Sequence, residues 1–222
     1  MSKLSLTTFL ILSLSFCPHL GATIYLNGPG AGITVAVGPG TSPGSFNNTF
    51  NAGNTIDKVI DAPSATATEF HNQTTHIWYT ATNVGGGLEL LFDFQTEFDI
   101  STLHFWNFTG ESFDVDNIDF TFFDLSNTQV GMLSVAPALG SSPGITAQDI
   151  PLAAPLNVQF VTAFLTGNNR QVDFQNIGFT AEVSIPVTPP TNPIPEPSTI
   201  AIWSLLGLVG MSVHRRRKQR AA

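Results

Sequence analysis

Leu88-Glu89-Leu90-Leu91-Phe92-Asp93-Phe94 is the stretch that decides the fold of this chain of 222 residues. Every second residue, starting from Leu88, is apolar, whereas Glu89 and Asp93 occupy the other parity. This period of two is typical of a β-strand with one buried and one wet face. The stretch therefore predicts an antiparallel sheet that packs against a second layer.

Further stretches with strand character surround this one, between turn clusters rich in Gly, Asn, Thr and Pro. They are residues 33–37, 102–108, 118–124, 158–165 and 177–183. Helical periodicity is absent from this part of the chain. We therefore expect an all-β fold, an antiparallel sandwich or jelly roll, over residues 23–185.

The order of these segments resembles the discoidin-like, or galactose-binding-like, jelly roll. The resemblance rests on the Trp-bearing segment 75–80, the strand 88–94, the strand 100–107 that ends in Trp-Asn, residues 158–161 and the closing segment 176–179. Many members of this family bind glycans through loops at one end of the sandwich. The resemblance thus implies glycan binding, with polysaccharide as a partner, although one fold can host other roles.

The end of the chain carries three features in a fixed order. A Pro-rich spacer, residues 186–194, leads into Pro195-Glu196-Pro197, and the uncharged apolar run 199–213 follows. A basic cluster then closes the chain, with Arg215, Arg216, Arg217 and Lys218. The run of 15 residues is shorter than the roughly 20 that usually span a bilayer. The basic cluster should remain on the cytoplasmic side of a membrane.

Residues 195–220 resemble the PEP-CTERM sorting signal of exosortase substrates. The resemblance implies an exported protein of a Gram-negative bacterium, whose precursor is anchored in the inner membrane by a transmembrane helix over 199–213. Its partners would be the exosortase and the secretion machinery, which pass it to the cell surface or extracellular matrix. An ordinary single-pass tail anchor is the alternative reading of the same residues.

The beginning of the chain also indicates export. Lys3 precedes a mostly apolar stretch, residues 4–16, and Leu20-Gly21-Ala22 offers a cleavage site, so residues 1–22 are expected to be a secretory signal peptide. Cys17 lies inside this peptide. The mature protein would then contain no cysteine, and its stability would come from an ordinary core.

Charge is distributed very unevenly along the chain. Between residues 23 and 194 two basic residues, Lys58 and Arg170, face fifteen acidic ones, which gives a net charge of −13. Such a surface repels phosphate backbones, so nucleic-acid binding is excluded. It can attract divalent cations, or it can simply be a solvated acidic surface.

Catalytic motifs are absent from the sequence, and we expect no enzyme. His71 and His76 lie five residues apart in a polar loop and suggest a metal site, but no third ligand is evident. Asp93 and Glu97 form a carboxylate pair of the kind that glycosidases use, although nothing in the sequence fixes their separation.

A second set of acidic residues suggests weak calcium binding. Asp114, Asp116 and Asp119 lie close together, but they lack the central Gly and the distant Glu of a calcium loop. Alternating acids at a strand edge are the competing interpretation. No other cofactor is expected.

Three residues are candidates for a glycan site. Trp106 and Trp78 offer aromatic faces for stacking on a sugar, and Arg170 offers hydrogen bonds to hydroxyls. The competing interpretation places both indoles in the core and pairs the arginine with a neighbouring acid. The sequence thus predicts an exported, non-catalytic surface or matrix protein that binds glycans. A purely structural envelope protein and a polysaccharide-acting enzyme are the alternatives.

Overall fold

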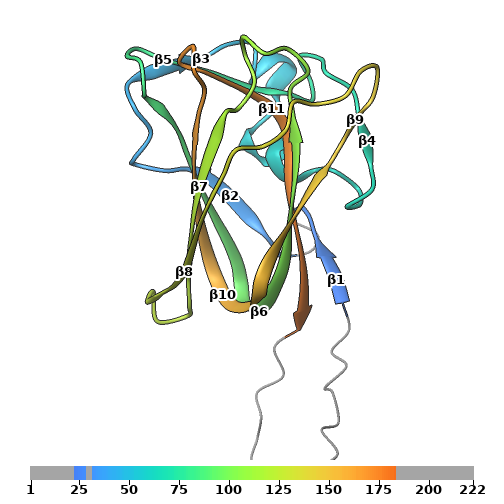
Figure 1. The fold of residues 1–222 in the computed structure, drawn as a ribbon, viewed down its shortest axis with the longest axis vertical. Coiled ribbons are helices and arrows are strands. Elements are labelled where there is room, and N and C mark those ends of the chain that lie inside the picture. The colour runs from blue at the N-terminus through green and yellow to red at the C-terminus, as the bar shows by residue number, and fades with distance from the viewer. Residues whose placement is uncertain (1–22, 29–31, 184–222) are drawn as a thin grey trace, which may run out of the picture. The chain divides into compact units, whose positions relative to one another are not determined.

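A computed structural model describes residues 23–28 and 32–183. The predicted signal peptide, the Pro-rich spacer and the sorting signal with its transmembrane helix lie outside these residues. Within the described part, no helix has the length and apolar character needed to cross a membrane. The strands and two 3₁₀ helices (Figure 1) are β1 Thr23–Leu26, β2 Thr34–Val37, β3 Gly44–Phe46, η2 Asn51–Gly53, η3 Ile56–Ile60, β4 Thr68–Glu69, β5 Ile77–Ala81, β6 Gly87–Asn107, β7 Asn117–Phe123, β8 Gln129–Val135, β9 Ile145–Thr146, β10 Gln148–Thr166 and β11 Gln171–Val183.

All strand pairs in this part of the chain are antiparallel, which confirms the predicted all-β class. The main sheet runs in the order β3-β5-β11-β6-β10-β7-β8, with β1 beside β11 and β2 beside β6. The sheet folds over itself into two layers (Figure 1). One layer contains β2, the first half of β6, the second half of β10, β7 and β8; the other contains β3, β5, β11 and the remaining halves of β6 and β10.

Strand β6 passes from one layer to the other without ending. The stretches 88–94 and 102–108, which the sequence presents as two strands, belong largely to this one strand. At the bend Gln95 adopts a positive φ of 61°, and its N–H donates to Asp93 Oδ1 over 2.8 Å. The partner strand β10 is irregular between Pro151 and Leu156. Irregular positions of this kind bend a strand and let it turn the corner between layers.

The core lies between the two layers. The predicted apolar parity of the first half of β6 is confirmed, because Leu88, Leu90, Phe92 and Phe94 are all buried. From β11 in the opposite layer, Phe179 meets Phe92 and Phe94 with ring centroids 5.2 and 5.0 Å apart. These near-perpendicular contacts connect the layers through edge-to-face aromatic packing.

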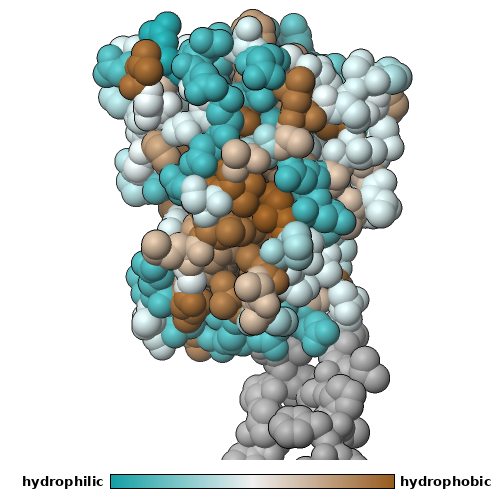
Figure 2. All heavy atoms as spheres, in the orientation of Figure 1, coloured by the Kyte–Doolittle hydropathy of each residue, from teal (hydrophilic) through white to brown (hydrophobic). Residues whose placement is uncertain are grey.

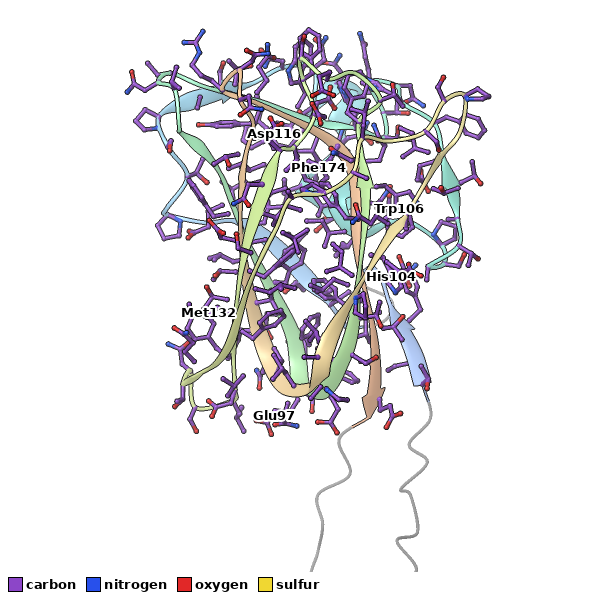
Figure 3. All side chains as sticks on the ribbon, in the orientation of Figure 1. Glu97, His104, Trp106, Asp116, Met132 and Phe174 are labelled. Carbon is purple, nitrogen blue, oxygen red and sulfur yellow. The ribbon has the colours of Figure 1, made fainter. Side chains whose placement is uncertain are left out.

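Strand β8 was not expected from the sequence. It lies at the edge of the sheet beside β7, and its side chains are mostly exposed, with Met132 74% accessible (Figure 3). A strand with little burial has no strong alternation to reveal it.

Figure 2 shows polar residues over the end that carries β3 and β5, and apolar residues over the middle of the same face.

We predict that Phe179→Ala lowers the free energy of unfolding by about 3–5 kcal/mol, because it leaves a cavity between the layers. Urea denaturation followed by circular dichroism measures this difference. Val84→Ala is the matched control, since Val84 is 82% exposed and its truncation should change stability by less than about 0.5 kcal/mol. A Phe179→Ala loss no larger than the control's would contradict the placement of Phe179 at the layer contact.

Candidate functional site

A pocket of about 270 Å³ opens at the end of the sandwich where β11 begins. Its walls come from β5, β11, the loop before β5, the loop between β6 and β7, and the segment between β3 and η2. The lining residues are Asn48, His71, Asn72, Gln73, His76, Trp78, Phe108, Phe113 and Asp173. It combines three aromatic rings with two imidazoles, three amides and one carboxylate.

The pairing of β11 with β5 places the polar floor of this pocket. Asp173 stands opposite Trp78 in the register of the two strands. Its neighbours Val172 and Phe174 are buried in the main core, so Asp173 points to the other face of the strand. His76 precedes β5 and has the same parity as Trp78, which brings it to that face as well.

The loop before β5 folds His71 back over His76. Asn72 organises this turn: its Oδ1 accepts from Thr74 N over 2.8 Å, and its carbonyl accepts from His76 N over 3.1 Å. The imidazoles of His71 and His76 then meet at 90° with ring centroids 4.7 Å apart. The spacing of five residues therefore corresponds to a compact turn that brings both rings to one point.

The two histidines converge on the carboxylate of Asp173. His76 Nδ1 lies 3.3 Å from Asp173 Oδ1, and His71 Nε2 lies 3.8 Å from Asp173 Oδ2. His76 and Asp173 are each 3% exposed, whereas His71 reaches the pocket mouth. The sequence analysis did not identify this third partner, because Asp173 is almost 100 residues away along the chain and only the β5–β11 register brings it here.

Burial governs the ionisation of the cluster. Burial raises the pKa of the Asp173 carboxyl above its ordinary value, although His76, His71 and Lys58 oppose the rise. Burial also lowers the pKa of His71, against the attraction of Asp173. Lys58 is itself buried, which lowers its pKa, and its ammonium donates to the carbonyl of Thr49. The cluster is thus set in a poorly solvated environment.

Aromatic rings form the wall beside this cluster. The Trp78 indole is partly exposed, and its Nε1 donates to Gln171 Oε1 over 2.7 Å. Phe113 meets Trp78 edge-on with ring centroids 5.9 Å apart, and the ring centroids of Phe108 and His71 are 4.2 Å apart. Trp78 is therefore anchored by a hydrogen bond and lines the pocket with a partly exposed side chain, and its role in a glycan site stays a prediction.

Trp106 has a different role, and its prediction as a ligand-binding residue is wrong. Its side chain is 0% exposed, and it packs in a small second core with Ala62 and Ile145. The indole Nε1 donates to the carbonyl of Ala67 over 2.9 Å. The two-stranded sheet of β4 and β9 (Figure 1) lies over the outer face of β6 here, so this part of the strand is buried on both faces.

Arg170 lies in the turn between β10 and β11, with a positive φ of 66°. Its guanidinium donates to the carbonyl of Thr82 over 2.8 Å, and it does not line the pocket. The expected partner was an acidic side chain, and the observed one is a backbone carbonyl. The Arg170 side chain therefore connects the β10–β11 turn to the loop after β5 and is not part of the pocket lining.

The three predicted calcium ligands are not brought together as a metal-binding group in the described part of the chain. Asp114 is buried, and Asp116 accepts the side chain of Asn168 over 2.7 Å. Asp119 is exposed on β7. Asp114 and Asp116 precede β7, whereas Asp119 lies within the strand, so nearness in sequence does not place the three carboxylates around one point.

Asp93 and Glu97 are likewise engaged in local structure. Asp93 caps the bend of β6 through Gln95, and Glu97 Oε1 accepts from Leu125 N over 3.1 Å. Glu97 lies at the end of the sandwich opposite Asp116 and the start of β11 (Figure 3). These contacts do not arrange the pair around a common pocket.

Phe108 and Phe113 are pocket residues that the sequence reading missed. Both lie in the loop that follows β6, and Phe113 also accepts, through its carbonyl, from Asp173 N over 2.9 Å. The signal that could have found them is aromatic residues in a Gly- and Ser-containing loop, where no core is expected. For Asp173, the signal is an acid between two apolar residues of a central strand.

No family model matches this chain, and no curated protein matches its sequence. Solved structures resemble it in the arrangement of strands. The family 32 carbohydrate-binding module of C. perfringens NanJ, solved with galactose, has a TM-score of 0.46 at 9% identity, covering 71% of this chain and 99% of that one. A Streptococcus pneumoniae fucose-binding module has a TM-score of 0.44 at 12% identity, covering 64% and 92%. Likeness at this level assigns neither a family nor a ligand to this chain.

We predict that Asp114→Asn stabilises the protein at neutral pH. Burial, followed by repulsion from Asp116 and Glu111, raises the pKa of Asp114 from 3.8 to about 6. The folded protein binds the proton of this carboxyl more tightly than the unfolded chain does. Asp114 therefore favours folding below about pH 4, and this contribution is lost as the pH rises through about 6. At pH 7 the neutral amide should therefore add about 1 kcal/mol, since nearby solvent screens part of the effect.

The measurement is the melting temperature of both proteins at pH 7 and at pH 3.5. The gain should be a few degrees at pH 7 and should disappear at pH 3.5, where both side chains are neutral. Asp119→Asn, at an exposed position of β7, is the control and should change little at either pH. A gain of equal size at both pH values would show that ionisation of Asp114 is not its cause.

Proposed function

We propose that this chain is an exported, non-catalytic protein of the cell surface or extracellular matrix, sorted by an exosortase, whose β-sandwich binds glycans in the pocket beside Trp78. The export segments of the sequence support the location. The observation that carries the binding function is the partly exposed Trp78 indole, which Gln171 holds in a pocket with polar walls.

The chemistry of the pocket suits a sugar ring. A pyranose presents an apolar CH face and several hydroxyls, so it needs a flat ring for stacking and nearby hydrogen-bonding groups. Trp78 and Phe113 supply the rings, and Asn48, Asn72 and Gln73 supply donors and acceptors from the walls. With about 270 Å³, the pocket is near the lower end of ligand sites and fits one ring at a chain end.

The charge of the domain selects among glycans. Residues 23–194 contain fifteen acidic side chains and only two basic ones, Lys58 and Arg170. Both basic side chains hydrogen-bond to backbone carbonyls of the protein itself. The potential around the pocket is therefore negative, and it disfavours sialic and uronic acids. We propose that the ligand is a neutral sugar.

The position of the pocket is compatible with display on a surface. Thr23 and Val183 lie at one end of the sandwich, where β1 pairs with the last part of β11 (Figure 1). Asp173 is ten residues earlier in β11, roughly 30 Å away along the strand. The pocket therefore opens at the end remote from both ends of the described domain.

We predict that Trp78→Ala weakens glycan binding about fivefold, because stacking of this kind contributes on the order of 1 kcal/mol. The full chain is screened on an array of neutral and acidic glycans, and the affinity of the best neutral ligand is then measured for both proteins. Met132→Ala is the matched control, since Met132 is exposed on β8 away from the pocket.

Thermal unfolding of each variant separates lost binding from lost folding. Unchanged affinity in a folded Trp78→Ala protein would remove the pocket from the proposal. A chain that binds none of the glycans would favour the purely structural alternative, and release of shorter sugars from a bound glycan would favour the enzyme.

A further inference from the structure

We propose that His71, His76 and Asp173 bind one divalent transition-metal ion of the zinc type at the floor of the pocket. Within the described residues, these three side chains form the group whose ligand atoms all lie within 4.8 Å of one another. The proposal goes beyond glycan binding, because it concerns a metal ion and is tested by metal binding itself.

The distances fit a zinc ion after a small closure. Zinc binds His nitrogen and carboxylate oxygen at about 2.0–2.2 Å in a tetrahedral arrangement, which places neighbouring ligand atoms about 3.3–3.6 Å apart. His76 Nδ1 is already 3.3 Å from Oδ1 of Asp173, and His71 Nε2 is 3.8 Å from Oδ2. One ligand atom from each of the three residues lies within 4.8 Å of the others, so the group must draw closer around an ion. His71 belongs to a loop and its side chain is 27% exposed, so closure around an ion would move this residue more than the buried His76 and Asp173.

Unsatisfied buried atoms supply a second, independent observation. Both ring nitrogens of His76 and Oδ1 of Asp173 are buried without a hydrogen-bond partner. The 3.3 Å approach of His76 to Asp173 is thus a close contact without hydrogen-bond geometry. Buried polar groups in native structures are almost always satisfied, because leaving them unpaired is costly, so these atoms require an explanation. A metal ion would satisfy one nitrogen and the carboxylate together.

The donor set determines which ion fits. Imidazole suits zinc and its neighbours in the transition series, whereas calcium and magnesium prefer oxygen ligands alone. Three protein ligands leave the fourth position of a tetrahedral ion open, and here it would face the pocket. Among the described residues, the cation Lys58 lies nearby; it donates to the Thr49 carbonyl and interacts electrostatically with both Asp61 and Asp173.

The competing explanation is a histidine–carboxylate cluster that stabilises the loop and binds no metal. The two explanations differ in what removal of His71 does to metal binding. His71 is the ligand at the mouth, so its truncation should leave the fold intact while removing one of three ligands. Its loss should weaken binding by at least the roughly 10–100-fold that changes around metal ligands cost.

The test uses the untagged full chain, stripped of metal with a chelator. Titration calorimetry with Zn²⁺ should show one saturable site, and zinc should raise the melting temperature as its concentration exceeds the dissociation constant. Substituted Co²⁺ should give the intense visible absorption of a four-coordinate ion. His71→Ala should lose at least tenfold in Zn²⁺ affinity and should lose the Co²⁺ signal, while Asp119→Asn should retain both.

Metal-free melting temperatures show whether each variant folds, and Asp173→Asn provides a second variant that preserves side-chain volume. His19 and His214 are present in every variant, so binding at either of them appears as a zinc affinity that His71→Ala leaves unchanged. A zinc affinity that is unchanged in His71→Ala would overturn the proposal, and so would the absence of a saturable zinc site in the parent chain. A chain that binds zinc but no glycan would leave this site standing and remove only the glycan function.

Discussion

The pairing of β6 with β10 is the constraint on which the rest of this structure depends. Both strands are about twenty residues long, and each contributes one half to either layer of the sandwich. The pair therefore fixes the distance and angle between the layers, which loops alone would leave open. β11 adds to the second half of β6 and β7 adds to the second half of β10, so every other long strand takes its register from this pair.

The pocket is a consequence of that register. β11 extends beyond the end of β6, and its first residues pair with β5 while the loop after β6 caps them through Phe113. Val172 and Phe174 anchor this extension in the core, and Asp173 between them is forced toward the opposite face. A buried carboxylate with two imidazoles is a costly arrangement, and its place on a firmly anchored strand is typical of a site maintained for binding.

Much of the fold could be predicted from local patterns, because alternation along a strand reports burial directly. Leu88 to Phe94 and Ile118 to Phe122 are buried on the predicted parity. The continuity of β6 through Gln95 could not be predicted, since polar residues at the bend look like a turn. Trp106 was ambiguous for a related reason: the residues that cover its outer face, Ala62 and Ile145, lie 44 positions before it and 39 positions after it.

The site was less predictable than the fold because it is assembled from distant segments. His71 and His76 were visible as candidates in one loop, and Trp78 just after it. The site that they form also needs Asp173, which only the pairing of β5 with β11 supplies. The acidic cluster at Asp114, Asp116 and Asp119 shows the opposite case, in which nearness in sequence did not produce a shared site. Sequence spacing identifies metal ligands when they share one turn, and fails when a sheet must bring them together.

The most direct test of this account is anomalous X-ray diffraction at the zinc absorption edge, from crystals of the protein grown with Zn²⁺. The account predicts one strong peak at the pocket floor, within bonding distance of His71 Nε2, His76 Nδ1 and a carboxylate oxygen of Asp173, about 2.0–2.2 Å from each. A pocket without an anomalous peak, in crystals whose His71 and His76 side chains are well ordered, would contradict it.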